Sequence, residues 1–78
     1  MPVLSARMDN GVDNLLRAVS VLRRKDFDIV DVSMKSDVRS NHSNLIIKIS
    51  GNENTTEKAK FQLEKLFGLD EIRILEEM

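Results

Sequence analysis

The segment DIVDVSMKSDVRSNHSNLIIKIS (residues 28–50) decides the fold, because it places two strand-like runs on either side of a polar stretch. Residues 28–35 alternate between apolar and polar side chains, which predicts a strand with one buried face. Residues 45–50, LIIKIS, are apolar and β-branched and predict a central strand. The polar residues 37–44 predict a hairpin loop, with His42 as an exposed loop residue. The residues expected to face the core are Val30, Val32 and Met34 in the first run and Leu45, Ile47 and Ile49 in the second.

A helix is expected before this hairpin. Over residues 12–25 the apolar side chains recur at helical spacing. Asp9 or Asn10 can cap its start, because a short side-chain oxygen accepts hydrogen bonds from the free N–H groups of a first turn. The cationic run RRK, which ends at Lys25, suits the negative end of a helix. The expected apolar stripe is Val12, Leu15, Leu16, Val19 and Leu22.

A second helix is expected after the hairpin. Asn54, with Glu57 three residues later, resembles a capping box, and Gly68 stands where helices commonly end. Phe61 lies roughly opposite the apolar stripe at about 100° per residue, so its ring is expected to be exposed. An exposed Phe is either an ordinary surface residue or a contact for a partner. The expected stripe itself is Ala59, Leu63, Leu66 and Phe67.

Strands are also expected at both ends of the chain, because residues 2–8 and residues 71–77 alternate. The order β-α-β-β-α-β predicts an α+β, ferredoxin-like sandwich, with two helices covering one face of a four-stranded antiparallel sheet. A chain of 78 residues is expected to form a single domain, residues 1–78. The strands at the two ends of the chain would turn Leu4, Ala6, Met8, Ile72 and Ile74 towards the helices. The open face of the sheet would carry Val3, Ile29 or Ile46.

The composition argues against several classes of function. Lys plus Arg is 12 and Asp plus Glu is 13, so the basic surplus of a nucleic-acid-binding protein is missing. The chain has three Phe and no Tyr or Trp, too few aromatics for an RNA-recognition sheet. It has no Cys, which argues against a thiolate metal site and favours an intracellular protein. No apolar run suits a membrane span or a signal peptide, so a cytoplasmic location is expected.

The residues of an active site are not recognisable either. Catalysis needs a nucleophile with a base, paired carboxylates in a pocket, or a metal, whereas His42 stands alone and Glu76 and Glu77 lie near a chain end. We therefore expect no catalytic residue, metal or cofactor. A homodimer is expected instead, because small domains gain stability by association. The regular edge strand near residues 28–35 would offer its unpaired backbone groups to a second copy.

Two local patterns carry a resemblance to a known family. The first is NGVDNLLRAVSVLRRKDFDI (residues 10–29), and the second is QLEKL (residues 62–66) followed by an apolar strand. With these patterns, nearly the whole chain resembles an ACT domain, specifically the N-terminal part of the small regulatory subunit of acetolactate synthase (acetohydroxyacid synthase). The residues of the first pattern that carry the likeness are Asn10, Leu15, Arg17, Phe27 and Ile29.

The resemblance implies an effector site. In that family the turn after the first strand and the start of the first helix receive a branched-chain amino acid, usually valine, at a dimer interface. Free N–H groups at a helix start attract a ligand carboxylate, which gives this position a physical basis. By resemblance, the effector-binding residues here are Asn10, Gly11, Val12, Asp13, Asp28 and Ile29.

Two residues depart from the family pattern. Asp13 stands where a Gly is expected, and Asp28 stands where an Asn commonly opens the second strand. Both carboxylates would oppose the carboxylate of an amino acid, so a weakened or lost valine response is expected. A pairing shifted by one gap aligns Gly11 with the family Gly instead. Asp13 has a simpler interpretation too, because an acidic residue in a first helical turn stabilises a helix by about 0.3–1 kcal/mol.

The function implied by the resemblance is that of a non-catalytic regulatory or activating subunit in branched-chain amino-acid biosynthesis. Such a subunit docks as a dimer on the catalytic large subunit of acetolactate synthase. That large subunit uses thiamine diphosphate, Mg²⁺ and FAD, none of which this chain is expected to bind. Longer small subunits carry a second domain, while short single-ACT forms also associate with the large subunit. The alternatives are a stand-alone ACT-type amino-acid sensor with a different partner and a purely structural dimerisation module.

Overall fold

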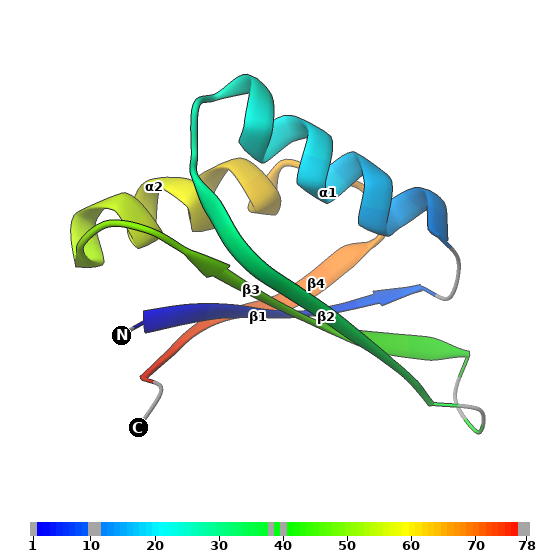
Figure 1. Ribbon diagram of the computed structural model, residues 1–78. Helices are drawn as coiled ribbons and strands as arrows, with labels where there is room; N and C mark the ends of the chain where they lie inside the picture. Colours follow the sequence, from blue (N-terminus) through cyan, green and yellow to red (C-terminus); the bar gives the residue numbers. More distant parts are fainter. Residues whose placement is uncertain (1, 10–11, 38, 40, 77–78) are drawn as a thin grey trace.

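The computed structural model describes residues 2–9, 12–37, 39 and 41–76. They form the β-α-β-β-α-β order that the sequence predicts. In chain order the elements are β1 (Pro2–Asp9), α1 (Val12–Arg24), β2 (Ile29–Asp37), β3 (His42–Ile49), α2 (Glu53–Glu64) and β4 (Leu69–Glu76) (Figure 1).

The four strands form one antiparallel sheet in the order β2-β3-β1-β4, so β1 and β3 are central and β2 and β4 are the edges. Both helices lie on the same face of this sheet (Figure 1). The ferredoxin-like sandwich predicted from the sequence is therefore confirmed. Within the described part of the chain, no helix is both long and apolar enough to cross a lipid bilayer.

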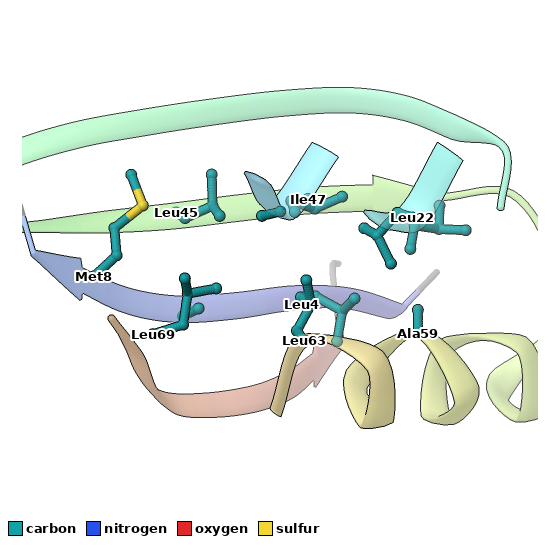
Figure 2. Packing of buried hydrophobic residues seen from close by; sticks show 11 residues of the cluster. Leu4, Met8, Leu22, Leu45, Ile47, Ala59, Leu63 and Leu69 are labelled. Carbon is teal, nitrogen blue, oxygen red and sulfur yellow. The ribbon is translucent and has the colours of Figure 1, made fainter. Parts of the chain in front are cut away.

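The hydrophobic core lies between the sheet and the two helices (Figure 2). The two central strands contribute the alternating residues that the sequence predicts, because every second side chain of a strand points to the helical face. Burial of a side chain of leucine size stabilises a fold by about 1.5–3 kcal/mol. The buried cluster consists of Leu4, Ala6, Met8, Ala18, Leu22, Leu45, Ile47, Ile49, Ala59, Leu63 and Leu69.

Helix α1 packs on the sheet through only part of the expected stripe, with Leu15 and Leu22 but without Leu16. Leu16 belongs to the predicted stripe but is 56% exposed, whereas Ala18 is completely buried. The two residues lie about 160° apart around the helix, so both cannot face the sheet. Leu15 and Leu22 lie on the same side as Ala18, which makes Leu15, Ala18 and Leu22 the true stripe. The sequence pattern placed too much weight on the larger side chain of Leu16.

The end of α1 turns the chain sharply towards β2. Asp26 has a φ of 64°, the left-handed conformation common just after a helix. The Asp26 N–H donates to the carbonyl of Arg23 at 3.1 Å, and the Phe27 N–H donates to the carbonyl of Leu22 at 3.0 Å. This pair of bonds is a Schellman motif, and it folds Phe27 back against the core.

Helix α2 starts earlier and ends earlier than the sequence suggested. Its cap is Asn52 rather than Asn54, because the Asn52 side chain accepts a hydrogen bond from the Thr55 N–H at 3.0 Å. The helix ends at Glu64, so Phe67 lies beyond it and is 87% exposed instead of joining the stripe. The other three expected stripe residues are buried or partly buried against the core, namely Ala59, Leu63 and Leu66.

The hairpin is tighter than predicted. His42 is the first residue of β3 and is half-buried, so the expectation of an exposed loop residue was wrong. At the start of β2 the register with β3 shifts between Ile29 and Asp31, which leaves Val30 exposed. The same shift turns Ile29 towards the helices. The sequence placed Ile29 among the candidates for the open face of the sheet, and this prediction was wrong.

The face of the sheet opposite the helices carries polar and charged side chains around a small apolar centre. Val3 and Ile46 occupy this centre, as predicted, because they pair with residues that also face away from the helices. Leu75 of β4 pairs with Val3 and extends the apolar centre to one edge. Because successive side chains of β1 point to opposite faces and Leu4 is buried beneath the helices, its neighbour Val3 points to the face away from them.

Candidate functional site

The turn between β1 and α1 is the first part of the candidate site. Asn10 and Gly11 lie outside the described residues, and so does the side chain of Val12, which is the first residue of α1. Asp13 is exposed in the first turn of the helix. The free N–H groups of this turn and the positive end of the helix dipole favour a negatively charged group nearby. Asp13 supplies such a charge from within the chain.

Asn14 holds the start of α1 in place, a role that the sequence pattern did not indicate. Its side-chain amide donates to the Asp9 carbonyl at 3.3 Å, and its Oδ1 lies 3.5 Å from the Arg17 guanidinium, which donates to it. The Asp9 N–H donates to the carbonyl of Gly68 at 3.2 Å. Asn14 thereby links α1, the end of β1 and the turn before β4.

Gly68 is required at this junction for two reasons. Its φ is 89°, a conformation that residues with a side chain rarely adopt. A Cβ at this position would also lie 2.9 Å from the Oδ1 of Asn14. The sequence identified Gly68 only as the end of a helix, whereas the structure places it beside the turn between β1 and α1.

Asp28 and Ile29, the second part of the candidate site, lie at the other end of α1. Asp28 is exposed and accepts a hydrogen bond through its carbonyl from the Ser50 N–H at 2.9 Å. Ile29 is paired with Ile49 and packs on the core. The 13 residues of α1 span about 20 Å, so one chain does not bring Asp28 close to Asp13. Of the six residues named from the sequence, the four that the structure describes therefore form two separate groups in a single chain, Val12 with Asp13 and Asp28 with Ile29.

The end of β2, in contrast, lies at the same end of the sheet as the β1–α1 turn. Asp9 of β1 and Asp37 of β2 both pair with His42 of the intervening strand β3. β1 and β2 consequently run parallel, and residues 28 and 29 lie near the start of β1 rather than near its end. The Asp37 end of β2, and not its start, is therefore the part of this edge strand nearest to Asp9.

Charged side chains cluster on the open face beside this turn. The imidazole Nε2 of His42 is 3.7 Å from the Asp9 carboxylate. Arg7 donates to the Asp70 carboxylate through two nitrogens, at 3.0 and 2.9 Å, and lies 3.8 Å from Glu71. The hydrogen bonds from Arg7 lower the pKa of Asp70, and the same contact raises the pKa of Arg7. The contacts of Arg7 fix the start of β4 against β1, and the His42 contact joins β3 to β1.

No group of three His, Asp or Glu side chains suited to holding a metal occurs among residues 2–9, 12–37, 39 and 41–76. What the described residues offer near the turn is a helix start, exposed carboxylates and an unpaired strand edge. Such an arrangement can bind a small molecule or a second chain by hydrogen bonds and charge.

Comparisons with known proteins identify the fold. No protein-family model matches the sequence, and no curated protein matches it either. Among solved structures, the acetolactate synthase small subunit from Thermotoga maritima superposes with a TM-score of 0.85 at 19% identity, over 96% of this chain. This chain therefore has the fold of an ACT domain. It spans 47% of the length of that small subunit, or about half.

The ACT fold also occurs in structures with other names. The ACT domain from GTP pyrophosphokinase of Chlorobium tepidum matches with a TM-score of 0.68 at 14% identity, covering 95% of both chains. A formyltetrahydrofolate deformylase from Pseudomonas syringae matches with a TM-score of 0.69 at 16% identity, over 95% of this chain and 26% of its own. At such identities, these likenesses establish the fold.

Proposed function

We propose that this ACT domain is a non-catalytic regulatory subunit of acetolactate synthase, which acts as a homodimer and docks on the catalytic large subunit. The observation that carries the proposal is the TM-score of 0.85 with an acetolactate synthase small subunit, against 0.68 and 0.69 for the GTP pyrophosphokinase domain and the deformylase. The sequence patterns in residues 10–29 and 62–66 support the same subunit independently of the fold.

The homodimer would form along the free edge of β2. An antiparallel pair of β2 strands with its two-fold axis at Ser33 is complementary with itself. In that register Asp31 lies opposite Lys35 of the second copy, and Val32 lies opposite Met34 of the second copy. Opposite charges and apolar pairs across antiparallel strands each stabilise by about 0.2–1 kcal/mol. Every such pair occurs twice in a two-fold dimer.

This dimer would also bring the two groups of site residues together. In the same register Ile29 of the second copy lies opposite Asp37, at the end of the sheet that carries the β1–α1 turn. Asp28 of the second copy would then stand beside the start of α1. Each dimer would hold two such sites, each built from residues 10–13 of one chain and Asp28 and Ile29 of the other.

The site would respond weakly to valine. Asp13 lies exposed in the first turn of α1, where a ligand carboxylate would have to bind, and Asp28 would approach from the second copy. Like charges brought together in a partly desolvated site repel. The double variant Asp13→Gly/Asp28→Asn is expected to lower the dissociation constant of valine, measured by calorimetry, by at least about tenfold. A tenfold change requires the removal of only ~1.4 kcal/mol of repulsion. Asp26→Asn, a neighbouring exposed Asp outside the site, is the matched control.

The test of the function is association with the catalytic large subunit. The tagged chain, co-expressed with the acetolactate synthase large subunit of the same organism, is expected to retain it through purification and to change its acetolactate-forming activity. If the two proteins fail to associate at micromolar concentration, and the activity is the same with and without this chain, the proposal is wrong.

A stand-alone amino-acid sensor is the second candidate. The observation in its favour is that the ACT domain of GTP pyrophosphokinase matches this chain over 95% of both lengths, so the fold serves in more than one protein. This candidate requires that the isolated protein bind an amino acid without the large subunit. Calorimetric titration with branched-chain, aromatic and hydroxy amino acids tests it, and the absence of heat in all of them would contradict it.

A further inference from the structure

A hollow of about 390 Å³ lies on the helical side of the molecule, where the end of α1 meets the outer face of α2. It is separate from the β1–α1 turn, because α1 begins at that turn and the lining residues Lys25 and Phe27 follow the other end of the helix. Two of the three Phe residues of the chain line it. The lining residues are Lys25, Phe27, Glu57, Lys58, Phe61 and Gln62.

The two aromatic rings are held in place by different means. The Schellman motif at the end of α1 folds Phe27 onto the core, so Phe27 forms a fixed wall of the hollow. Phe61 projects from the polar side of α2 and is 57% exposed. The ammonium group of Lys65, one turn further on, lies 4.5 Å from the centre of the Phe61 ring. Because a large ring gains nothing from standing in water, this position suits contact with another molecule.

The charges around the hollow are mainly positive. Lys25 and Lys58 line it and Lys65 covers one ring, whereas Glu57 is the acidic residue of the lining. Among the described residues, none of these three lysines forms an ion pair with a carboxylate. Their charges are therefore available to a molecule that brings carboxylates of its own.

We propose that this hollow docks an acidic segment of the catalytic large subunit, with one large apolar side chain between Phe27 and Phe61 and flanking carboxylates on Lys25 and Lys58. The inference rests on the proposed function, since it names the surface through which that function would act. A second copy is a poorer occupant, because a two-fold contact through this hollow would set the same lysines against each other. An acidic segment instead matches both the charge and the apolar wall.

The test compares variants of the hollow with matched variants outside it, titrated against the acetolactate synthase large subunit. Phe61→Ala and Lys58→Glu are each expected to raise the dissociation constant by about tenfold or more, as central aromatic and charged contacts do. Phe67→Ala removes a ring that is 87% exposed and outside the hollow, and Lys60→Glu reverses a charge on the same helix. Both controls are expected to stay within about twofold of the wild type, a change too small for a central contact.

Each other result overturns the proposal in a recognisable way. Wild-type affinity of Phe61→Ala and Lys58→Glu would disprove the docking surface and leave the proposed function standing. Failure of the wild-type protein itself to bind the large subunit would disprove both. If Phe61→Ala instead shifts the isolated protein from dimer to monomer in light scattering, the hollow is a contact between copies. Circular dichroism of each variant verifies that α2 remains folded.

Discussion

The two edge strands of the sheet differ in how open they are to another chain. On β4 the ladder to β1 shifts register between Ser5 and Arg7, and Glu71 adopts a φ of 48° at that irregularity. On β2 the register shifts only at the first residues, after which Asp31 to Asp37 pair with β3 without interruption. A bulge in an edge strand hinders further pairing, whereas a regular edge invites it.

The side chains sharpen this difference. β4 carries Asp70, Glu71 and Glu76 along its length, and charges on an edge discourage pairing. β2 carries charges too, but Asp31 and Lys35 have opposite signs and can attract each other across a two-fold pair. Both edges expose apolar residues, Val30 at 55% and Met34 at 37% on β2 and Leu75 at 44% on β4. The fold thus blunts one edge and leaves the other available, which is the physical basis for proposing a homodimer through β2.

The largest expected effect comes from a charge placed in the middle of the β2 edge. Met34→Lys removes an apolar contact with Val32 of the second copy twice per dimer. We expect the dimer to weaken by about 2 kcal/mol, or about thirtyfold in its dissociation constant, measured by sedimentation equilibrium. Leu75→Lys makes the same change on the β4 edge and is expected to leave dimerisation unaltered. If Leu75→Lys abolishes the dimer and Met34→Lys does not, the second copy pairs with β4 and not with β2.

A charge exchange tests the register of the β2 pair. Asp31→Lys alone would set two lysines against each other at both ends of the pair and weaken the dimer by about 1–2 kcal/mol. Adding Lys35→Asp restores opposite charges in the reversed sense and is expected to recover most of that loss. If the double variant is as weak as the sum of the single variants, Asp31 and Lys35 do not meet across the interface.

The sequence predicts the burial of a residue correctly where that burial depends only on the residues next to it in the chain. The alternation of Leu4, Ala6 and Met8 is set by strand geometry alone, so it was predicted correctly. Val30 and Glu71 lie at register shifts, which depend on the strand alongside and leave no mark in the local pattern. Phe67 looked like a core residue because the end of α2 is set by how the chain turns towards β4.

The candidate site was harder to predict than the fold. A motif gives the order of residues along the chain, and in that order Asp13 and Asp28 appeared to belong to one site. The structure separates them by the length of α1, a consequence of helical rise that the motif does not show. Asn14 was overlooked because its hydrogen-bond partner Asp9 and its neighbour Gly68 come from two other parts of the chain.

The irregularity in β4 also has a cost in stability, because it strains the backbone of Glu71. Glu71 is held in the left-handed region, which costs a residue with a side chain about 1–2 kcal/mol. Glu71→Gly is expected to stabilise the protein by about 1 kcal/mol, seen as a higher midpoint in urea unfolding, because glycine adopts this φ freely. Glu57→Gly, in the exposed middle of α2, should lose about 1 kcal/mol and serves as the control. A loss of stability in Glu71→Gly would show that the carboxylate matters more than the backbone.

The smallest expected effect concerns pH. Because hydrogen bonds from Arg7 lower the pKa of Asp70 in the folded protein, Asp70 contributes stability above its unfolded pKa and loses that contribution as the pH falls through its folded pKa. Asp70→Asn should therefore narrow the difference in melting temperature between neutral pH and a pH below about 4. Both side chains are exposed, so the change is small. An unchanged pH profile in Asp70→Asn would mean that this pair does not anchor β4.

The central claim is that two copies pair along β2 about an axis at Ser33 and so complete the divided site. The chain has no Cys, so Ser33→Cys introduces a single thiol at the axis. Directly opposite residues of an antiparallel pair have Cβ atoms about 4.5–5.5 Å apart, near the spacing that a disulfide requires. Under mild oxidation we predict that Ser33→Cys becomes a covalent dimer, as seen by non-reducing electrophoresis, while Arg73→Cys on β4 does not. If Arg73→Cys rapidly forms a disulfide-linked dimer and Ser33→Cys forms none, the proposed pairing of two β2 strands is wrong.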